Sequence, residues 1–431
     1  MKINYKTTFL VGLAFLTISS FWQLYDFVIP LIMLKAFRVG DTLAGFVMSI
    51  DNILALFLLP LFGMLSDRTS TRIGRRMPYI LAGTGAAVVF MMLIPFAAQK
   101  RNLPLFIVAL AITLLSMAFY RSPAVALMPD ITPKPWRSKG NAVINLMGAV
   151  GGILILGLIS AIAPGKDSIN YWPLFLATAC IMVVGITILT LTVREPKMVL
   201  RMREESAAMG IDEEDPSETA SKKEHTKLPK DVRRSLIFIL FSIALWFMGY
   251  NAMTTAFSKY ALKALSIPES RSAQILLIAN VAAIISFIPV GQIASRIGRK
   301  KTVLFGVAVL ATVFATASFY TAFSPLMYVS FGLAGIAWAS INVNSLPMVL
   351  DMSKGSNVGR YTGYYYAFSM SAQIVTPILS GFLLEHVSYR TLLPYCAIFV
   401  ALSFVTMLMV RHGDTKPSVP TSKLEKFAEM E

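Results

Sequence analysis

The segment Gly63–Tyr79, with the sequence GMLSDRTSTRIGRRMPY, decides how this chain folds. It carries one aspartate and four arginines between two apolar runs that are long enough to lie only in lipid. A shortened copy, Gly291–Lys301 with the sequence GQIASRIGRKK, begins 228 positions later and again lies between apolar runs. Two such basic loops indicate a membrane protein built from two related halves.

The composition is that of a polytopic membrane protein. Of the 431 residues, 56% are hydrophobic and 14% are charged, whereas soluble domains carry roughly a quarter charged residues. If twelve spans leave both termini in the cytoplasm, 29 Lys and Arg lie on the inner side, 9 outside and 1 within a span. This asymmetry follows the positive-inside rule. The net charge of +16 therefore indicates orientation and contact with anionic lipid, and no nucleic-acid partner is expected.

Twelve apolar runs have the length of about 20 residues that a spanning helix needs. They lie near residues 8–34, 42–64, 79–98, 104–128, 140–163, 172–193, 235–257, 273–294, 302–322, 325–350, 361–383 and 391–410. The prediction is an all-α integral membrane protein of 12 transmembrane helices in two six-helix pseudo-repeats. We expect it to be a multi-pass protein of the cell membrane.

The same reading divides the chain into four parts. They are an N-terminal bundle (1–193), a flexible cytoplasmic linker (194–234), a C-terminal bundle (235–411) and a cytoplasmic tail (412–431). Linker and tail are rich in charge, Ser and Pro and lack apolar periodicity, so neither is expected to hold chemistry. The first apolar run has no small-residue cleavage site and is predicted to be a retained span.

The halves repeat beyond the two loops. Span four ends in RSPAVALMPD (121–130), and span ten ends in NSLPMVLD (344–351). Each ending contains a proline and closes on an aspartate at the inner mouth, and an Arg-x-x-Gly then opens the next helix, at 137–140 and at 360–363. Internal repeats of this size are typical of secondary transporters, which bind substrate near the midplane between the halves.

This layout resembles the major facilitator superfamily. The loop SDRTSTRIGRRMPY and the Pro-x-x-Ala-Leu-x-x-Asp ending of span four resemble the cation-coupled glycoside symporters, particularly the sucrose–proton carriers of plants and their animal proton–sugar relatives. The resemblance covers both halves and implies alternating access with an inner gate braced by the loop residues. The gate residues expected are Gly63, Asp67, Arg68, Gly74, Arg75, Arg76, Asp130, Gly291, Arg296, Arg299, Asp351 and Arg360.

Simple electrostatics supports such a gate. Arginines beside an aspartate at helix ends suit ion pairs between helices and interactions with helix dipoles. For Arg68 and Arg75, a role as topology signals alone stays open. The second copy has Ser295 in the place of Asp67, so the two gates are expected to differ in strength.

Three ionisable residues lie well inside the predicted spans: Asp26, Asp51 and Arg121. A charge in the membrane is costly and is a functional candidate by default. Asp26 shares a helical face with Trp22 and Gln23, and this face offers a sugar a ring for stacking and acceptors for its hydroxyl groups. The alternative is a tilted helix end that lets Asp26 reach the outer water.

Asp51 lies roughly 12 Å below the outer end of its span, at about 1.5 Å per residue. Burial favours the neutral form of a carboxyl group, so Asp51, with Asp26, is a candidate for proton coupling; an outer-gate role is the alternative. The sodium-coupled melibiose permeases, as the resemblance goes, carry acids where this chain has Ala55 and Leu59. This departure favours a proton over sodium, and we expect no metal site and no cofactor.

Arg121 lies too deep to pair directly with Asp26 by the same counting. Asn145 on span five lies at a similar depth and could bond the guanidinium group. The plant carriers, as the resemblance implies, have an arginine where Val125 stands here. A structural role for Arg121, holding spans four and five together, therefore stays open.

The second half has no ionisable residue deep in a predicted span. We expect it to supply neutral polar contacts to a substrate while the first half handles charge. Amides in lipid must find partners, whereas aromatic side chains in spans usually serve packing or interfacial belts. The candidates we assign to the site are Tyr250, Asn251, Trp338, Asn342, Tyr365 and Gln373.

The function expected is proton-coupled symport of a sugar, a glycoside or a disaccharide. The alternatives are sodium-coupled sugar symport, or a carrier of an amphipathic lipid, a drug or an organic anion for which Arg121 would be the counter-ion. The chain is not expected to be an enzyme, because no cluster in the spans has nucleophile or metal geometry and no phosphate-binding loop is present. Its partners should be a small molecule and membrane lipid, with no obligate protein partner.

Overall fold

The computed structural model describes residues 5–133, 136–165, 168–208, 229–352 and 358–414. Within these ranges all regular elements are helices, and 12 of them are long and apolar enough to cross a membrane. The predicted all-α fold with twelve spans is confirmed. The spans of the N-terminal half are α1 (Tyr5–Ile32, continued by a π-helical turn, Met33–Phe37), α2 (Asp41–Arg68), α3 (Met77–Gln99), α4 (Leu103–Asp130), α5 (Arg137–Ile162) and α6 (Trp172–Thr192).

The spans of the C-terminal half match the same pattern but are longer in places than their apolar cores. They are α8 (Lys230–Ala264), α9 (Glu269–Ile297), α10 (Arg299–Ala317), α11 (Leu326–Asp351), α12 (Val358–His386) and α13 (Leu392–Leu408), the last preceded by a short 3₁₀ turn, Tyr389–Thr391. Span seven, expected to end at 257, continues to Ala264. This extra length carries Lys259 into the buried part of the molecule.

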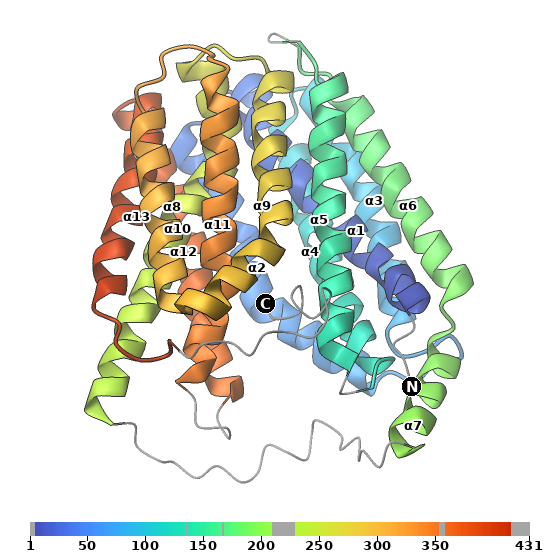
Figure 1. The fold of residues 1–431 in the computed structure, drawn as a ribbon. Coiled ribbons are helices and arrows are strands. Elements are labelled where there is room, and N and C mark those ends of the chain that lie inside the picture. The colour runs from blue at the N-terminus through green and yellow to red at the C-terminus, as the bar shows by residue number, and fades with distance from the viewer. Residues whose placement is uncertain (1–4, 134–135, 166–167, 209–228, 353–357, 415–431) are drawn as a thin grey trace.

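The two halves lie side by side (Figure 1). The spans of the N-terminal half occupy one side of the bundle and those of the C-terminal half the other, apart from α2, which packs against α12 between them. Large apolar side chains such as Leu176, Val184 and Leu191 of α6 are exposed on the outside, where a lipid-embedded helix needs them. We call the face that carries the loop after α2 the inner face, following the charge asymmetry of the sequence.

The segment after α6 departs from the prediction of a flexible linker. Residues Glu195–Ala208 form α7, a 14-residue helix at the inner face (Figure 1). It buries Glu195, Met202 and Ser206, so one side of it packs although its apolar content is low. Residues 209–228 of the predicted linker lie outside the described residues, and its last five residues, 230–234, are helical and begin α8.

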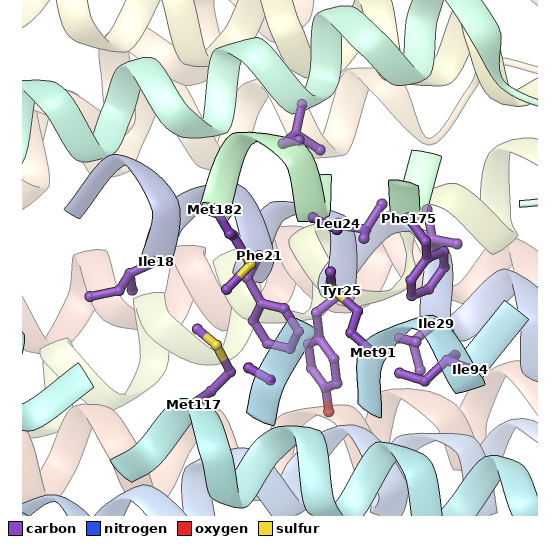
Figure 2. Close-up of a cluster of buried hydrophobic side chains, with 14 of the residues drawn as sticks. Ile18, Phe21, Leu24, Tyr25, Ile29, Met91, Ile94, Met117, Phe175 and Met182 are labelled. Atoms are coloured by element: carbon purple, nitrogen blue, oxygen red, sulfur yellow. The ribbon is translucent and has the colours of Figure 1, made fainter. Parts of the chain in front are cut away.

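The core of the N-terminal half fixes the orientation of α1. Figure 2 shows buried side chains of α1 packed against those of α3, α4 and α6; the labelled ones are Ile18, Phe21, Leu24, Tyr25, Ile29, Met91, Ile94, Met117, Phe175 and Met182. Because these residues hold one side of α1 in the core, its other side, with Trp22, Gln23 and Asp26, is left for the boundary between the halves.

The halves meet most closely at the outer face. There α2 packs against α12 and α5 against α9, and Ser49 of α2 donates a hydrogen bond to the carbonyl oxygen of Ile374, at 2.8 Å. The inner ends of the two bundles diverge (Figure 1). The arrangement is that of a carrier closed on its outer face.

Candidate functional site

A cavity of about 200 Å³ lies between the halves. The N-terminal half contributes Gln23 and Asp26 of α1 and Ala149 of α5 to its wall, and the remaining wall comes from α8, α9, α10 and α11. The polar residues of this second group are Tyr250, Thr254 and Asn280. The structure thus places the predicted face of α1 opposite the C-terminal half, at a boundary where a transported solute can meet both.

Asp26 has no hydrogen bond or ion pair with any residue in the part of the chain that the structure describes. Asn280 donates one amide hydrogen to the carbonyl oxygen of Leu276, 2.9 Å away, and its amide oxygen stays available. Trp22 has a buried indole N–H without a partner. Asp26 and Asn280 could hydrogen-bond a solute, because burying a polar group without a partner is costly. Trp22 is not among the residues that line the cavity; its ring packs against the core of the N-terminal half.

The aromatic wall of the cavity is a stacked pair. The rings of Tyr250 and Trp338 are parallel within 2° and their centroids lie 3.5 Å apart. Phe247 meets Trp338 edge to face, at 5.5 Å between centroids. This packing fixes both rings, so the pair offers a flat and pre-formed surface.

Asp51 and Arg121 form a charged group beside the cavity. The opposite charges of these two side chains attract each other, whereas the two carboxyl groups of Asp51 and Asp26 repel each other. The guanidinium group of Arg121 lies over the Trp22 ring, 5.9 Å from its centroid, and the Asp51 carboxylate accepts a hydrogen bond from the Asn52 amide at 2.9 Å. The carboxyl group facing Arg121 is therefore that of Asp51.

The structure does not join Arg121 to Asn145. Within the described residues no hydrogen bond is seen between these two side chains, so a contact of Asn145 with Arg121 that holds spans four and five together stays a prediction. Arg121 also interacts electrostatically with Tyr366 of α12. The neighbours of Arg121 therefore come from α1 and α2 of its own half and from α12 of the other half.

Five other residues assigned to the site are not among those that line this cavity: Asn145, Asn251, Asn342, Tyr365 and Gln373. Tyr365 is buried and its hydroxyl group lies 3.1 Å from that of Ser345, which is a packing contact between α12 and α11. Gln373 donates to the carbonyl oxygen of Ser369 in its own helix, at 3.3 Å. Asn251 keeps a buried amide oxygen without a partner.

At the inner face, the loop after α2 forms an ion-pair network. Asp130, at the end of α4, accepts from Arg76 Nε and from Arg75 Nη2, each at 2.7 Å, and Arg76 also pairs with Asp67. Burial alone would lower the pKa of Arg76, but the carboxylates of Asp130 and Asp67 outweigh this effect and raise it. The network ties α2, α3 and α4 together and holds Arg76 charged.

Glu195 completes this network, although it lies in the segment predicted to hold no chemistry. Its buried carboxylate accepts from the backbone N–H groups of Arg75, Arg76 and Met77, at 2.8 to 3.0 Å, and so caps α3. A carboxylate at a helix N-terminus is favoured by the helix dipole. Gly74, in the loop just before α3, has φ 118°, a conformation that glycine adopts without strain.

The second half repeats this device in reduced form. Gly298 has φ 98°, Arg299 pairs with Asp351, and the Asp414 carboxylate accepts from the backbone N–H of Lys300 at 2.8 Å. Ser295 bonds only within its own helix, to the carbonyl oxygen of Gln292. In each half, a carboxylate that follows the sixth span binds the N-terminus of the third span: Glu195 binds α3, and Asp414 binds α10. The second network has no ion pair at Ser295 that corresponds to the pair of Asp67 with Arg76.

The other expected gate residues lie apart from these networks. Arg68 and Arg296 are exposed. Arg360 stacks on Tyr364 and donates to its hydroxyl group at 2.7 Å. Gly63 approaches the hydroxyl group of Ser122, whereas Gly291 faces open space.

The outer face is closed by two buried ion pairs that the sequence did not reveal. Lys259 of α8 reaches Asp41 of α2 at 2.6 Å, and Tyr389 donates to the same carboxylate. Lys35 pairs with Glu269 of α9, which also accepts from Tyr171 at 2.8 Å; burial and Glu269 raise the pKa of Tyr171. Both pairs connect one half with the other, so we call them the outer latches.

Comparison with known proteins identifies the family. The profile of the Major Facilitator Superfamily matches residues 11–322 and 275–429. A sucrose transport protein, SUC3 of Arabidopsis thaliana, is 26% identical over 171 residues, which cover 35% of this chain and 28% of that protein. An MFS-type transporter, ppzB of Metarhizium rileyi, is 26% identical over 146 residues, 34% of this chain and 30% of that one. The chain thus matches less than a third of the length of either relative.

Solved structures agree with the fold. The nucleoside transporter NupG superimposes with a TM-score of 0.66 at 15% identity, over 94% of this chain and 100% of that one. A structure from the proton-dependent oligopeptide transporters gives 0.68 at 16% identity, over 94% and 98%. The family profile covers most of the chain, and the fold and its internal repeat agree with it: this protein is a member of the Major Facilitator Superfamily.

Proposed function

We propose that this secondary transporter carries a sugar, a glycoside or disaccharide, together with a proton by alternating access. Its family makes it a transporter and not an enzyme, and its twelve spans make it a multi-pass membrane protein. Beyond the family and the twelve spans, we propose the solute (a sugar), the coupling ion (a proton) and a location in the cell membrane with both termini in the cytoplasm.

One observation carries the proposal: Asp26 faces the cavity between the halves with no partner in the described chain. Gln23 and Asn280 line the same cavity, and Tyr250 and Trp338 stack at its wall. Carboxylate and amide oxygens accept hydrogen bonds from hydroxyl groups, and a flat ring suits the apolar face of a sugar. The local similarity to a sucrose transport protein supports the same solute class.

The charges of the site support a proton as coupling ion. Asp51 interacts electrostatically with the carboxyl group of Asp26 and with the guanidinium group of Arg121. A single proton shared by the carboxyl groups brings this set to zero net charge, which a membrane interior favours. If the proton and the sugar each favour the same closed state, the proton gradient drives accumulation of the sugar.

We expect Asp26→Asn to abolish accumulation driven by a proton gradient. One pH unit is worth about 1.4 kcal/mol, so two units at one proton per sugar support about 100-fold accumulation. Labelled glycosides taken up by proteoliposomes, with and without a protonophore, measure this ratio. Asp231→Asn, the same change at an exposed carboxylate of α8, is the control and should accumulate normally. Equal accumulation in wild type with and without the protonophore would contradict proton coupling.

A further inference from the structure

We propose that the outer face carries a second binding site, one for an oxyanion of the phosphate or sulfate type. The site is a depression of about 850 Å³ to which both halves contribute. No residue lines both this depression and the cavity that Asp26 lines. The proposal is therefore independent of the solute that the protein carries.

Positive charge gathers in the depression although the outer side of the protein is poor in it. Nine Lys and Arg lie on the outer side in the predicted topology. Four of them line the depression: Lys35, Arg38, Arg101 and Lys263. Because the positive-inside rule places basic residues near the inner ends of spans, topology gives no reason for this cluster.

Three of the four cations are uncompensated. Lys35 pairs with Glu269 in an outer latch. The side chains of Arg38, Arg101 and Lys263 have no ion pair or hydrogen bond with any residue in the part of the chain that the structure describes. All three are exposed, so they are accessible to an anion from the outer water.

The carboxylates of the depression do not neutralise these cations. Asp41 is bound by Lys259 at 2.6 Å, in the other outer latch. Glu385 accepts a hydrogen bond from the backbone N–H of Thr42 at 2.7 Å. With each latch neutral as a pair, three cations face the single carboxylate of Glu385, and the depression attracts anions.

The internal repeat shows that the backbone turn at Arg38 does not itself need an arginine. Arg38 follows the π-helical turn with φ 52°, and Ser266, 228 positions later, follows α8 with φ 54°. In both turns the next backbone N–H donates to the carbonyl oxygen six residues before it, at 3.1 and 2.9 Å. Because serine makes the same turn, the arginine contributes its charge and not its backbone.

Arg101 repeats this feature after α3, with φ 50°. Glycine is the usual residue in such a left-handed helix cap, yet both left-handed positions that line the depression carry arginine. The planar guanidinium group matches the oxygens of phosphate and sulfate with two parallel hydrogen bonds. Since Lys263 comes from the other half, an anion held by all three side chains joins the two halves.

Equilibrium binding of radiolabelled inorganic phosphate to the purified protein in detergent tests this site, with the ionic strength held constant by chloride. We expect saturable binding that sulfate displaces. Arg101→Gln and Lys263→Gln should each weaken it at least about 10-fold, the effect of losing one hydrogen bond between charged groups. Lys100→Gln, at an exposed neighbour that does not line the depression, is the matched control and should bind as the wild type does.

Lipid nanodiscs distinguish the two sources of such an oxyanion. If a free anion fills the site, phosphate binds equally well in phosphatidylcholine and in phosphatidylglycerol. If the headgroup of an anionic lipid fills it, phosphatidylglycerol prevents the binding of phosphate; either result supports the site. Absence of saturable binding in detergent, or binding that Arg38→Gln, Arg101→Gln and Lys263→Gln all leave unchanged, would overturn it.

Discussion

At the residue scale, the outer latches are the contacts most sensitive to a single change. Asp41 and Lys259 are 5% and 4% exposed, so each charge depends on the other for compensation. Breaking a buried ion pair from one side costs about 3–5 kcal/mol, because the remaining charge is left unpaired. A carrier can avoid the cost of an unpaired buried charge by opening its outer face, because water then solvates that charge.

Lys259→Ala should therefore shift the protein towards an outward-open state. A cysteine at Val47, a buried position of α2, would report this shift by its reaction with a membrane-impermeant maleimide, in a background without Cys180 and Cys396. We expect alkylation to rise at least several-fold. Lys263→Ala removes an exposed lysine of the same helix and should change nothing; an unreactive cysteine in Lys259→Ala would argue against the latch.

Glu195 offers a second test at this scale. Glu195→Gln keeps the size of the side chain but removes the charge that accepts from three N–H groups of the α3 N-terminus. We expect a loss of roughly 1.5–3 kcal/mol in stability, the range for hydrogen bonds to charged groups, read as a lower unfolding temperature in detergent. Glu205→Gln, which breaks only an i,i+4 pair with the exposed Arg201, should cost at most about 0.5 kcal/mol.

At the element scale, the outer face closes because α2 and α12 approach one another at glycines. A methyl group on Gly45 would lie 2.0 Å from the carbonyl oxygen of Pro377, and one on Gly381 would lie 2.2 Å from that of Asp41. Both clashes are with backbone, which cannot move aside as a side chain can. The closed outer face therefore requires glycine at these two positions.

Gly45→Ala should hold α2 and α12 apart at their outer ends. Spin labels at Leu43 and Phe382, which are exposed on these helices, should show a longer distance than in the parent protein, and uptake of solute should fall. Gly157→Ala is the control, since a methyl group there meets nothing within 4 Å. An unchanged label distance would mean that the helices close without this contact.

At the scale of the whole molecule, the spans were predictable because each needs only a local apolar run. The face of α1 with Trp22, Gln23 and Asp26 was predictable for the same reason, since i, i+3 and i, i+4 spacing needs no tertiary knowledge. Lys259 was missed because its helix continues past the apolar core, and its partner Asp41 lies 218 positions away. Glu195 was missed because its role depends on where α7 folds back.

The sequence also did not indicate which uncharged polar and aromatic residues of the C-terminal half line the cavity. Asn280 and Trp338 line the cavity while Asn342 and Gln373 do not, and apolar helices carry too little periodicity to tell these faces apart. The depth argument for Arg121 correctly disfavoured a direct pair with Asp26. It could not indicate Asp51, because that contact depends on how α2 and α4 pack against each other.

The most direct test of proton–sugar symport is the external pH of lightly buffered, de-energised cells that contain this protein, recorded as glycosides are added. We expect the medium to become more alkaline with a transported sugar, because protons enter with it. Asp51→Asn should abolish this change while labelled sugar still exchanges across the membrane. A flat pH trace in the wild-type protein during measurable sugar entry would contradict proton coupling at this site.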